Sequence, residues 1–231
     1  MKKQRNYLDY LDLIRVHPLF HGFNEEEVLY LLDYLSAAVE RIEAGNPINT
    51  ADSQAVSPIQ SGCILSGSAQ HVKYDLWGKC SILDYIMPGY LFGCTHAFAD
   101  VHYHNTSILT VKPCICLYLD LKKLDLRKED GSPVLSRLGL NIIRILSERD
   151  YRLYRRLDML ARRTLREKIL TYLSYVRDEH KSDSFDIPFN RQEMADYLYV
   201  ERSSLSTELG KLRQEGWLEF HHNHFKIKRL T

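Results

Sequence analysis

Polar and basic residues near the C-terminal end of the chain repeat along one face of a predicted helix over Arg202–Glu215. They are Arg202, Ser203, Ser206, Thr207, Lys211 and Arg213. A guanidinium group can donate to both acceptors on the major-groove edge of guanine, whereas hydroxyl and ammonium groups also suit phosphate oxygens. These residue types therefore predict noncovalent recognition of DNA at this face.

Two short helices are needed to position this face. Asn190 can cap a helix over 191–198, and Glu193 completes the capping box. Ala195 is small enough to let the following helix cross closely, and Tyr199–Glu201 forms the tight turn between the two helices. A helix pair with a basic outer face on its second member suits insertion into the major groove.

A β-hairpin is predicted directly after the second helix. Gly216 is typical of a helix end, and the segments 217–220 and 225–228 flank a polar turn at His221–His224. Together the helix pair and the hairpin predict a winged helix-turn-helix. A small helical domain used for protein contacts is the alternative.

The middle of the chain, from about Ser36 to Leu121, has the pattern of an antiparallel β-sandwich or barrel. Short apolar runs alternate with turn signals such as Ser66–Gly67 and Lys112–Pro113. The connections are too short for crossover helices, so the strands are expected to be antiparallel. A helix capped by Asn24 precedes this region.

A long helix is predicted from Pro133 to about Leu160. One row of its residues repeats at steps of four and three, as in a coiled coil, and consists of Gly139, Ile143, Leu146, Asp150, Leu153, Leu157 and Leu160. A second apolar row beside it consists of Leu135, Leu138, Ile142 and Ile145. With two rows the helix can pack on its own domain and on a second copy, so we expect a homodimer. The residues expected at the dimer contact are Ile143, Leu146, Asp150, Leu153 and Leu157, and a single wide face buried within a monomer is the alternative.

Several stretches resemble the CRP/FNR family of bacterial transcription regulators. Residues 191–216 are similar to the C-terminal DNA-binding domain of that family, and residues 166–173 to the first helix of that domain. Met87–Gly93 is similar to the family's P-G-x-x-F-G segment in a β-roll, and Ile64–Gly67 to another β-roll turn. The resemblance covers nearly the whole chain. It implies a sequence-specific regulator that acts as a homodimer on near-palindromic DNA.

The resemblance also implies an α+β fold of three parts. An antiparallel β-roll sensor domain, similar to cyclic-nucleotide-binding jelly rolls, would occupy residues 1–131 together with its flanking helices. A dimerisation helix would follow at residues 132–160, and a winged helix-turn-helix at residues 161–231. The implied partners are double-stranded DNA, a second copy of the chain and an unidentified small-molecule effector, with RNA polymerase as a further candidate.

The resemblance implies that the recognition helix begins near Glu201. Arg202 then occupies the position at which family members have an arginine that reads a base. Ser203 occupies a position at which the family often has glutamate, and Thr207 one at which it commonly has arginine. These two differences imply a different target sequence. The DNA-binding residues implied in this way are Arg191, Glu201, Arg202, Ser203, Ser204, Ser206, Thr207 and Lys211. The phosphate contacts expected among them are Ser204, Ser206 and Lys211.

Family members that bind cyclic nucleotides carry F-G-E in the β-roll and, after a short loop, R-S or R-T. Here Cys94 follows Phe92–Gly93, and the later position is Asn105–Thr106–Ser107, without an arginine. A buried anion needs a charged partner or an array of donors, so cyclic AMP and cyclic GMP are not expected. The expected pocket binds another small molecule or nothing, and consists of Phe92, Gly93, Cys94, Asn105, Thr106 and Ser107.

Histidines in the same region allow a second hypothesis, a cupin-like metal site with enzymatic or redox-sensing activity. A metal there would be bound by Cys94, His96, His102 and His104, and the candidate residues of a cupin-like enzyme would be Cys94, Asp100, His102 and His104. A solvated loop of polar residues between two strands is the simpler interpretation. We therefore expect no metal and no other cofactor, and we do not expect an enzyme. A thiol switch at Cys94 or Cys114 stays open as an alternative.

The composition agrees with a cytoplasmic globular protein. The chain has 231 residues, of which 45% are hydrophobic and 26% are charged, and its net charge is +1. No apolar run is long enough to span a membrane, and the basic N-terminus is not followed by the apolar core of a signal peptide. The five cysteines are irregularly spaced, which predicts reduced and mostly buried thiols instead of a disulfide framework.

Overall fold

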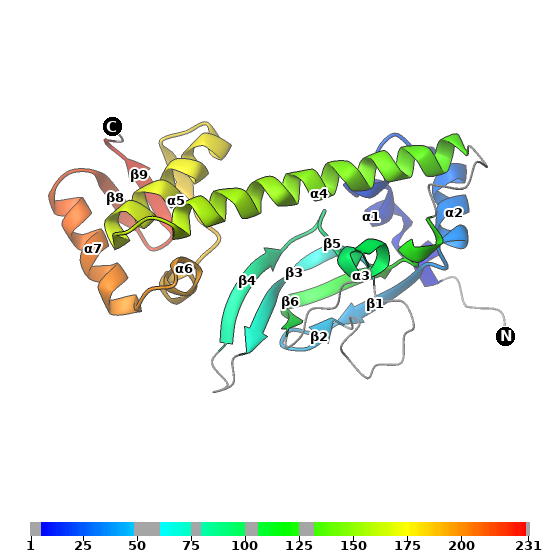
Figure 1. Cartoon of the computed structure of the whole chain (residues 1–231), viewed down its shortest axis with the longest axis horizontal. Helices are drawn as coiled ribbons and strands as arrows, with labels where there is room; N and C mark the ends of the chain where they lie inside the picture. Colours follow the sequence, from blue (N-terminus) through cyan, green and yellow to red (C-terminus); the bar gives the residue numbers. More distant parts are fainter. Residues whose placement is uncertain (1–5, 49–60, 75–79, 100–105, 125–131, 230–231) are drawn as a thin grey trace. The chain divides into compact units, whose positions relative to one another are not determined.

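The computed structural model describes residues 6–48, 61–74, 80–99, 106–124 and 132–229. The chain folds into two compact units, Met1–Arg149 and Asp150–Thr231. Figure 1 shows the elements of both units. Within the described ranges, no helix is both long and apolar enough to cross a membrane.

The first unit begins with short helices that precede a sheet. They are the 3-10 helix η1 (Asn6–Tyr10), α1 (Leu11–Arg15), the 3-10 helix η2 (Pro18–Phe20) and α2 (Glu25–Tyr34). As predicted, Asn24 caps α2: its Oδ1 accepts from the Glu27 N–H at 2.9 Å, and Glu27 Oε2 accepts from the Asn24 N–H at 3.0 Å. This reciprocal capping box satisfies two N–H groups that a helix start otherwise leaves to water.

An antiparallel sheet forms the body of the first unit. Its strands are β1 (Ala38–Ile42), β2 (Pro47–Ile48), β3 (Gly62–Tyr74), β4 (Cys80–Ile86), β5 (Leu91–Phe92) and β6 (Thr106–Tyr118). The order is β1-β6-β3-β4, with β2 also paired to β6 and β5 to β3, and every pairing is antiparallel. The antiparallel sheet predicted from the sequence is thereby confirmed. The helices α3 (Cys94–Ala99) and η3 (Leu121–Lys123) follow β5 and β6.

Two of the expected turns are irregularities inside long strands. Ser66–Gly67 lies within β3, where the register with β6 shifts, and Lys112–Pro113 lies within β6. Gly67 has a φ of +92°, and a Cβ there would stand 2.2 Å from the carbonyl oxygen of Pro113. The two strands approach so closely at this point that only glycine fits.

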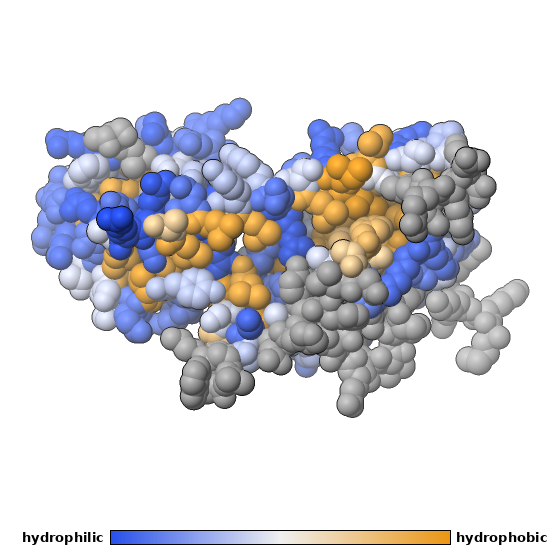
Figure 2. All heavy atoms as spheres, viewed as in Figure 1, coloured by the Kyte–Doolittle hydropathy of each residue, from blue (hydrophilic) through white to orange (hydrophobic). Residues whose placement is uncertain are grey.

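The long helix α4 runs over Pro133–Leu160, as predicted, and crosses the division between the two units. Leu138, Ile142 and Ile145 are buried in the core of the first unit. Other apolar residues of α4 are exposed, namely Leu140 (66%), Ile143 (56%), Tyr151 (61%), Tyr154 (69%) and Leu157 (67%). A helix that served only a monomer was expected to bury one wide apolar face. In the single chain, α4 leaves these apolar residues exposed instead. Figure 2 shows hydrophobic surface on the side of the molecule along which α4 runs in Figure 1.

The exposed row of α4 differs from the predicted row at alternate positions. Leu146 and Leu153 are partly buried and Gly139 is buried. An exposed row at steps of three and four instead consists of Leu140, Ile143, Ser147, Asp150, Tyr154 and Leu157. Neighbouring rows of one helix share the same period, so spacing alone could not decide between them. The side that packs on the sheet decides which row faces outward.

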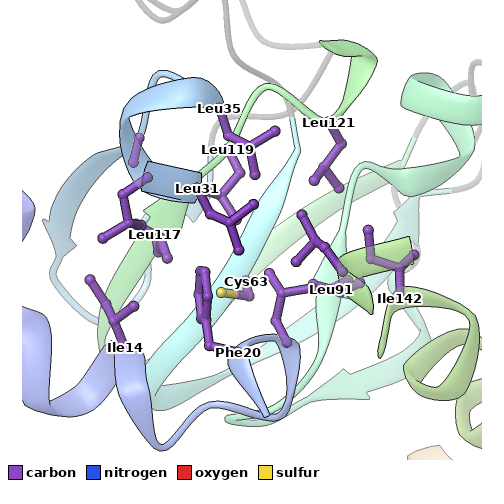
Figure 3. Packing of buried hydrophobic residues seen from close by; sticks show 14 of the residues in the cluster. Ile14, Phe20, Leu31, Leu35, Cys63, Leu91, Leu117, Leu119, Leu121 and Ile142 are labelled. Carbon is purple, nitrogen blue, oxygen red and sulfur yellow. The ribbon is translucent and has the colours of Figure 1, made fainter. Parts of the chain in front are cut away.

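The sheet has a buried core on each of its two faces, because successive strand residues point in opposite directions. On one face, Cys63 and Leu117 pack with the N-terminal helices and with Ile142 of α4 (Figure 3). On the other face, Ile64 and Cys116 pack in a second cluster with residues of β1, β2 and β4. The sheet is therefore fixed between two apolar layers.

The second unit contains the end of α4, three further helices and a small sheet. The helices are α5 (Leu165–His180), α6 (Arg191–Leu198) and α7 (Arg202–Gln214). The strands β7 (Ser184–Asp186), β8 (Leu218–His221) and β9 (His224–Ile227) form an antiparallel sheet in the order β7-β9-β8. The order of α6, α7 and the β8–β9 hairpin confirms the winged helix-turn-helix.

Candidate nucleic-acid interface

The helix α6 is fixed at both ends by its own sequence. Asn190 Oδ1 accepts from the Glu193 N–H at 3.0 Å, and Glu193 Oε2 accepts from the Asn190 N–H at 2.7 Å, as the capping box predicted. At the other end, Tyr199 has a left-handed backbone with a φ of +55°, and its N–H returns to the carbonyl oxygens of Ala195 and Asp196. The chain therefore leaves α6 through a defined turn toward α7.

The inner side of the helix pair is apolar and fully buried. Met194, Ala195 and Leu198 of α6 and Leu205, Leu209 and Leu212 of α7 have no measurable exposure. The outer side of α7 is exposed at every position predicted to face DNA, which are Arg202, Ser203, Ser204, Ser206, Thr207, Lys211 and Arg213. Because the buried residues fix the rotation of α7 about its axis, they also fix which side chains face outward.

The first turn of α7 has no side-chain cap. Glu201 is the N-cap residue, and its carboxylate makes no capping hydrogen bond. The first N–H groups of a helix carry partial positive charge and attract anions when no side chain covers them. This end of α7 can therefore receive a phosphate oxygen next to the guanidinium group of Arg202.

Thr207 and Lys211 are already engaged within α7. Thr207 Oγ1 donates to the carbonyl oxygen of Ser203 at 3.0 Å, so its hydroxyl remains available as an acceptor. In the major groove it can then accept from the amino group of adenine or cytosine. The ammonium of Lys211 lies 3.5 Å from Glu208 Oε2 and stays 59% exposed, which suits a phosphate contact.

Arg191 does not face solvent in the way the other basic residues do. Its guanidinium lies over the rings of Phe220 and Phe225, at 5.0 and 5.8 Å from their centroids. It also donates to the carbonyl oxygen of His222 at 3.2 Å. Burial, with a smaller contribution from the charge of Arg202, lowers the pKa of Arg191. Arg191 thus holds the start of α6 against the hairpin, and its charge adds to that of Arg202.

The β8–β9 hairpin is braced against β7. His222 has a φ of +51° in the turn, and Asn223 Nδ2 donates to the carbonyl oxygen of Ile187 at 3.1 Å. His224 bridges Ser184 and Asp186 of β7, with both contacts at 2.9 Å. The wing is therefore a three-stranded structure, not a free hairpin.

Arg166 is a positioning residue that sequence reasoning did not single out. This residue at the start of α5 forms an ion pair with Glu215 just after α7, and its guanidinium lies 5.3 Å from the ring centroid of Trp217. Glu208 Oε1 of α7 lies 3.9 Å from Nη1 of the same guanidinium group. These contacts fix α7 on α5, and no local sequence signal could reveal them because the partners are far apart in the chain.

Among the described residues of the predicted effector pocket, two are buried and two lie in strand pairing. Phe92 is a core residue, packed edge-to-face on Tyr118 with 5.6 Å between the ring centroids. The Cys94 side chain is buried, and burial raises its pKa to about 11. Thr106 and Ser107 pair with Lys73 and Val72 of β3. The remaining residues of this set are Gly93, which has a φ of +71°, and Asn105, which lies outside the described residues.

A cation missed by the sequence analysis lies near Cys94. It is Arg149 of α4, whose charge acts on the Cys94 thiol and opposes the effect of burial on its pKa. Of the residues proposed for a metal site or a cupin-like enzyme, Asp100, His102 and His104 lie outside the described residues, and His96 lies on α3 where a solvated loop was expected. In the part of the chain that the structure describes, no three His, Cys, Asp or Glu side chains gather as metal ligands would.

The second unit matches a known domain family. Residues 152–231 match the model of the Crp-like helix-turn-helix domain. A 67-residue segment is 33% identical to the transcriptional activator protein FnrL of Cereibacter sphaeroides. That match covers 25% of this chain and 27% of the relative, so it spans about a quarter of each protein.

Solved structures share the fold of most of the chain. The c-di-GMP responsive global regulator CLP of Xanthomonas campestris has a TM-score of 0.66 at 18% identity, over 90% of this chain and 100% of that one. A cyclic nucleotide-binding domain containing protein of Listeria monocytogenes has a TM-score of 0.65 at 19% identity, over 87% and 98%. At these identities the likeness concerns the fold alone.

Proposed function

We propose that the chain, whose residues 152–231 match the Crp-like helix-turn-helix domain, is a transcription regulator of the CRP/FNR type that binds specific DNA sequences as a homodimer. The observation that carries this proposal is the exposed polar and basic face of α7, whose opposite, apolar face is buried against the capped helix α6. The family consists of regulators and not of enzymes. The site contributes noncovalent contacts only, and no reaction step is assigned to it.

In the proposed complex, α7 enters the major groove and Arg202 donates to the O6 and N7 atoms of a guanine. Ser203 and Thr207 face neighbouring bases, with Thr207 acting as an acceptor because its proton is directed to Ser203. Ser204, Ser206, Lys211 and the first turn of α7 contact phosphates and set the register. Neither Ser203 nor Thr207 is charged, so the preferred sequence differs from that of members with glutamate and arginine there.

The proposed homodimer forms through α4. Its outward row contains Leu140, Ile143, Tyr154 and Leu157, which are more than half exposed in the single chain. An apolar row at steps of three and four is the pattern that pairs two helices in a coiled coil. A two-fold dimer would place two α7 helices in successive major grooves, ~34 Å apart, on a near-palindromic site.

The proposed regulator responds to a small molecule other than cyclic AMP. Cys94 stands where cyclic-nucleotide binders of the family carry glutamate, and burial keeps its thiol protonated at neutral pH. The proposed partners are thus DNA, a second copy of the chain and this effector, and RNA polymerase where the regulator activates transcription.

Selection of bound duplexes from a random DNA pool by the purified chain tests this proposal. We expect a two-fold symmetric motif, which Arg202→Ala should lose or relax at one base pair of each half-site. Arg41→Ala is a matched control, because Arg41 is an exposed arginine of the first unit. Failure to recover any motif, with and without metabolites from a cell extract, would contradict the proposal.

A further inference from the structure

Three ionisable side chains meet where β3 and β4 approach α4. His71 of β3 is the direct cross-strand partner of Asp84 on β4, and directly opposed residues on an antiparallel pair have neighbouring side chains. Arg149 of α4 lies with its Nε 3.6 Å from Asp84 Oδ2. The side chains of Arg149 and Asp84 are only 26% and 18% exposed, so this ion pair is largely removed from water.

Arg149 continues the inward-facing row of α4. Leu138, Ile142 and Ile145 of that row are buried in the apolar core, and the next position at the same spacing is Arg149. It is also the last residue of the first unit. The contact that fixes α4 to the sheet therefore changes from apolar packing to an ion pair at the point where the first unit ends.

His71 is held between opposite charges. Burial lowers its pKa, the charge of Arg149 lowers it further, and the charge of Asp84 opposes both. On its other side, His71 pairs with the apolar Ile108 of β6. A further ionisable group near Arg149 is the Cys94 thiol of α3, which burial keeps protonated. At neutral pH the site thus holds a neutral imidazole beside an intact ion pair.

We propose that His71, Asp84 and Arg149 form a proton-sensitive latch that holds α4 on the β3–β4 pair at neutral pH and loosens when His71 is protonated. A charged imidazole competes with Arg149 for the Asp84 carboxylate and repels the guanidinium group. Because both charges are largely buried, their interaction is weakly screened by water and salt. The latch is a property of the first unit and its helix, so it does not depend on DNA binding.

The first test is an NMR titration of the His71 imidazole in the full chain and in two variants. Arg149→Gln should move the His71 midpoint to higher pH, because it removes a repelling cation. Asp84→Asn should move the midpoint to lower pH, because it removes the attracting carboxylate. Opposite shifts in the two variants are expected, and a midpoint unchanged in both would overturn the proposal.

The second test is hydrogen exchange of the α4 amides around residues 142–149 between about pH 7.5 and pH 5.5. After correction for the intrinsic exchange rate, acidification should speed exchange several-fold in the natural chain. His71→Gln should remove this response, and Asp84→Asn should exchange fast at both pH values. His21→Gln is the control, since His21 is exposed in the same unit and contacts α4 through its backbone oxygen.

The proposal is wrong if the acid response of α4 persists in His71→Gln, or if the natural chain shows no response. Should His71→Gln fail to fold, the titration of the natural chain and of Arg149→Gln still decides the question. Neither measurement uses DNA, so failure of the latch and failure of the proposed regulator are separate results.

Discussion

At the scale of single residues, the surroundings of a basic side chain decide what it can recognise. Lys211 forms an ion pair with Glu208 on the same helix. Arg202 makes no ion pair or hydrogen bond within the part of the chain that is described. A planar guanidinium with all its donors free can bind a base edge in two places, while an ammonium acts as a point charge. The two residues should therefore affect DNA binding differently.

Arg202→Ala should weaken binding to the preferred site by ~1–3 kcal/mol and relax the preference at one base pair of each half-site. Lys211→Ala should weaken binding to all sequences alike and reduce the slope of log K against log salt by ~0.9. Fluorescence anisotropy with matched and mismatched duplexes at several salt concentrations measures both effects. If Arg202→Ala kept the sequence preference, the assignment of the base-reading residue would fail.

His17 gives a second prediction at this scale. Its Nδ1 accepts from the Leu19 N–H at 3.1 Å, and burial lowers the pKa of the ring from 6.5 to about 4. As the pH falls, His17 is protonated in the unfolded chain before it is protonated in the folded chain. Acidification from pH 6.5 to pH 4 should therefore lower the free energy of unfolding by about 3 kcal/mol through this group.

His17→Asn keeps an acceptor for the Leu19 N–H and removes the titrating ring. Urea unfolding at a series of pH values should then show a smaller loss of stability on acidification than in the natural chain. His21→Asn, at an exposed position, serves as the control. An unchanged pH dependence in His17→Asn would contradict the assigned role.

At the scale of elements, the sequence predicts features that depend on residues close together in the chain. It does not predict contacts between residues that are far apart in the chain. The capping boxes at Asn24 and Asn190 and the range of α4 follow from neighbouring residues, and the structure confirms them. The contacts of Arg149 with Asp84 and of Arg166 with Glu215 join distant parts of the chain. Periodicity cannot reveal such pairs, because it describes one element at a time.

Two glycines near the end of α7 allow a matched test of element stability. Gly210 has ordinary helical geometry with nothing within 4 Å of an added Cβ, whereas Gly216 has a φ of +76°. Gly210→Ala should stabilise the second unit by about 0.5–1 kcal/mol. Gly216→Ala should destabilise it by ~1–2 kcal/mol, because its backbone is left-handed. Thermal unfolding measures both, and shifts of the same sign would refute the explanation.

At the scale of the whole molecule, α4 both supports the first unit and offers an exposed apolar row. Asp150 lies in that row, at the first residue of the second unit. In a parallel pair of helices, two copies of this aspartate would face each other across the seam. Such a charge would limit the strength of the dimer.

Ile143→Glu should weaken self-association by about 3 kcal/mol, or ~100-fold, because it places a charge in the apolar row of both copies. Asp150→Leu should strengthen self-association, because it continues that row. Sedimentation equilibrium of the two variants and the natural chain measures the effect. A natural chain that stays monomeric at high concentration would contradict the proposed dimer.

The distribution of the cysteines has a practical consequence. Cys63, Cys94, Cys114 and Cys116 are buried, and burial raises the pKa of each thiol, whereas Cys80 at the start of β4 is exposed. Only the thiolate reacts readily with electrophiles, so a maleimide dye should attach to Cys80 before any other thiol. Peptide mass mapping would verify the position. The natural chain thus already carries a single attachment point for a fluorophore on the strand that holds Asp84.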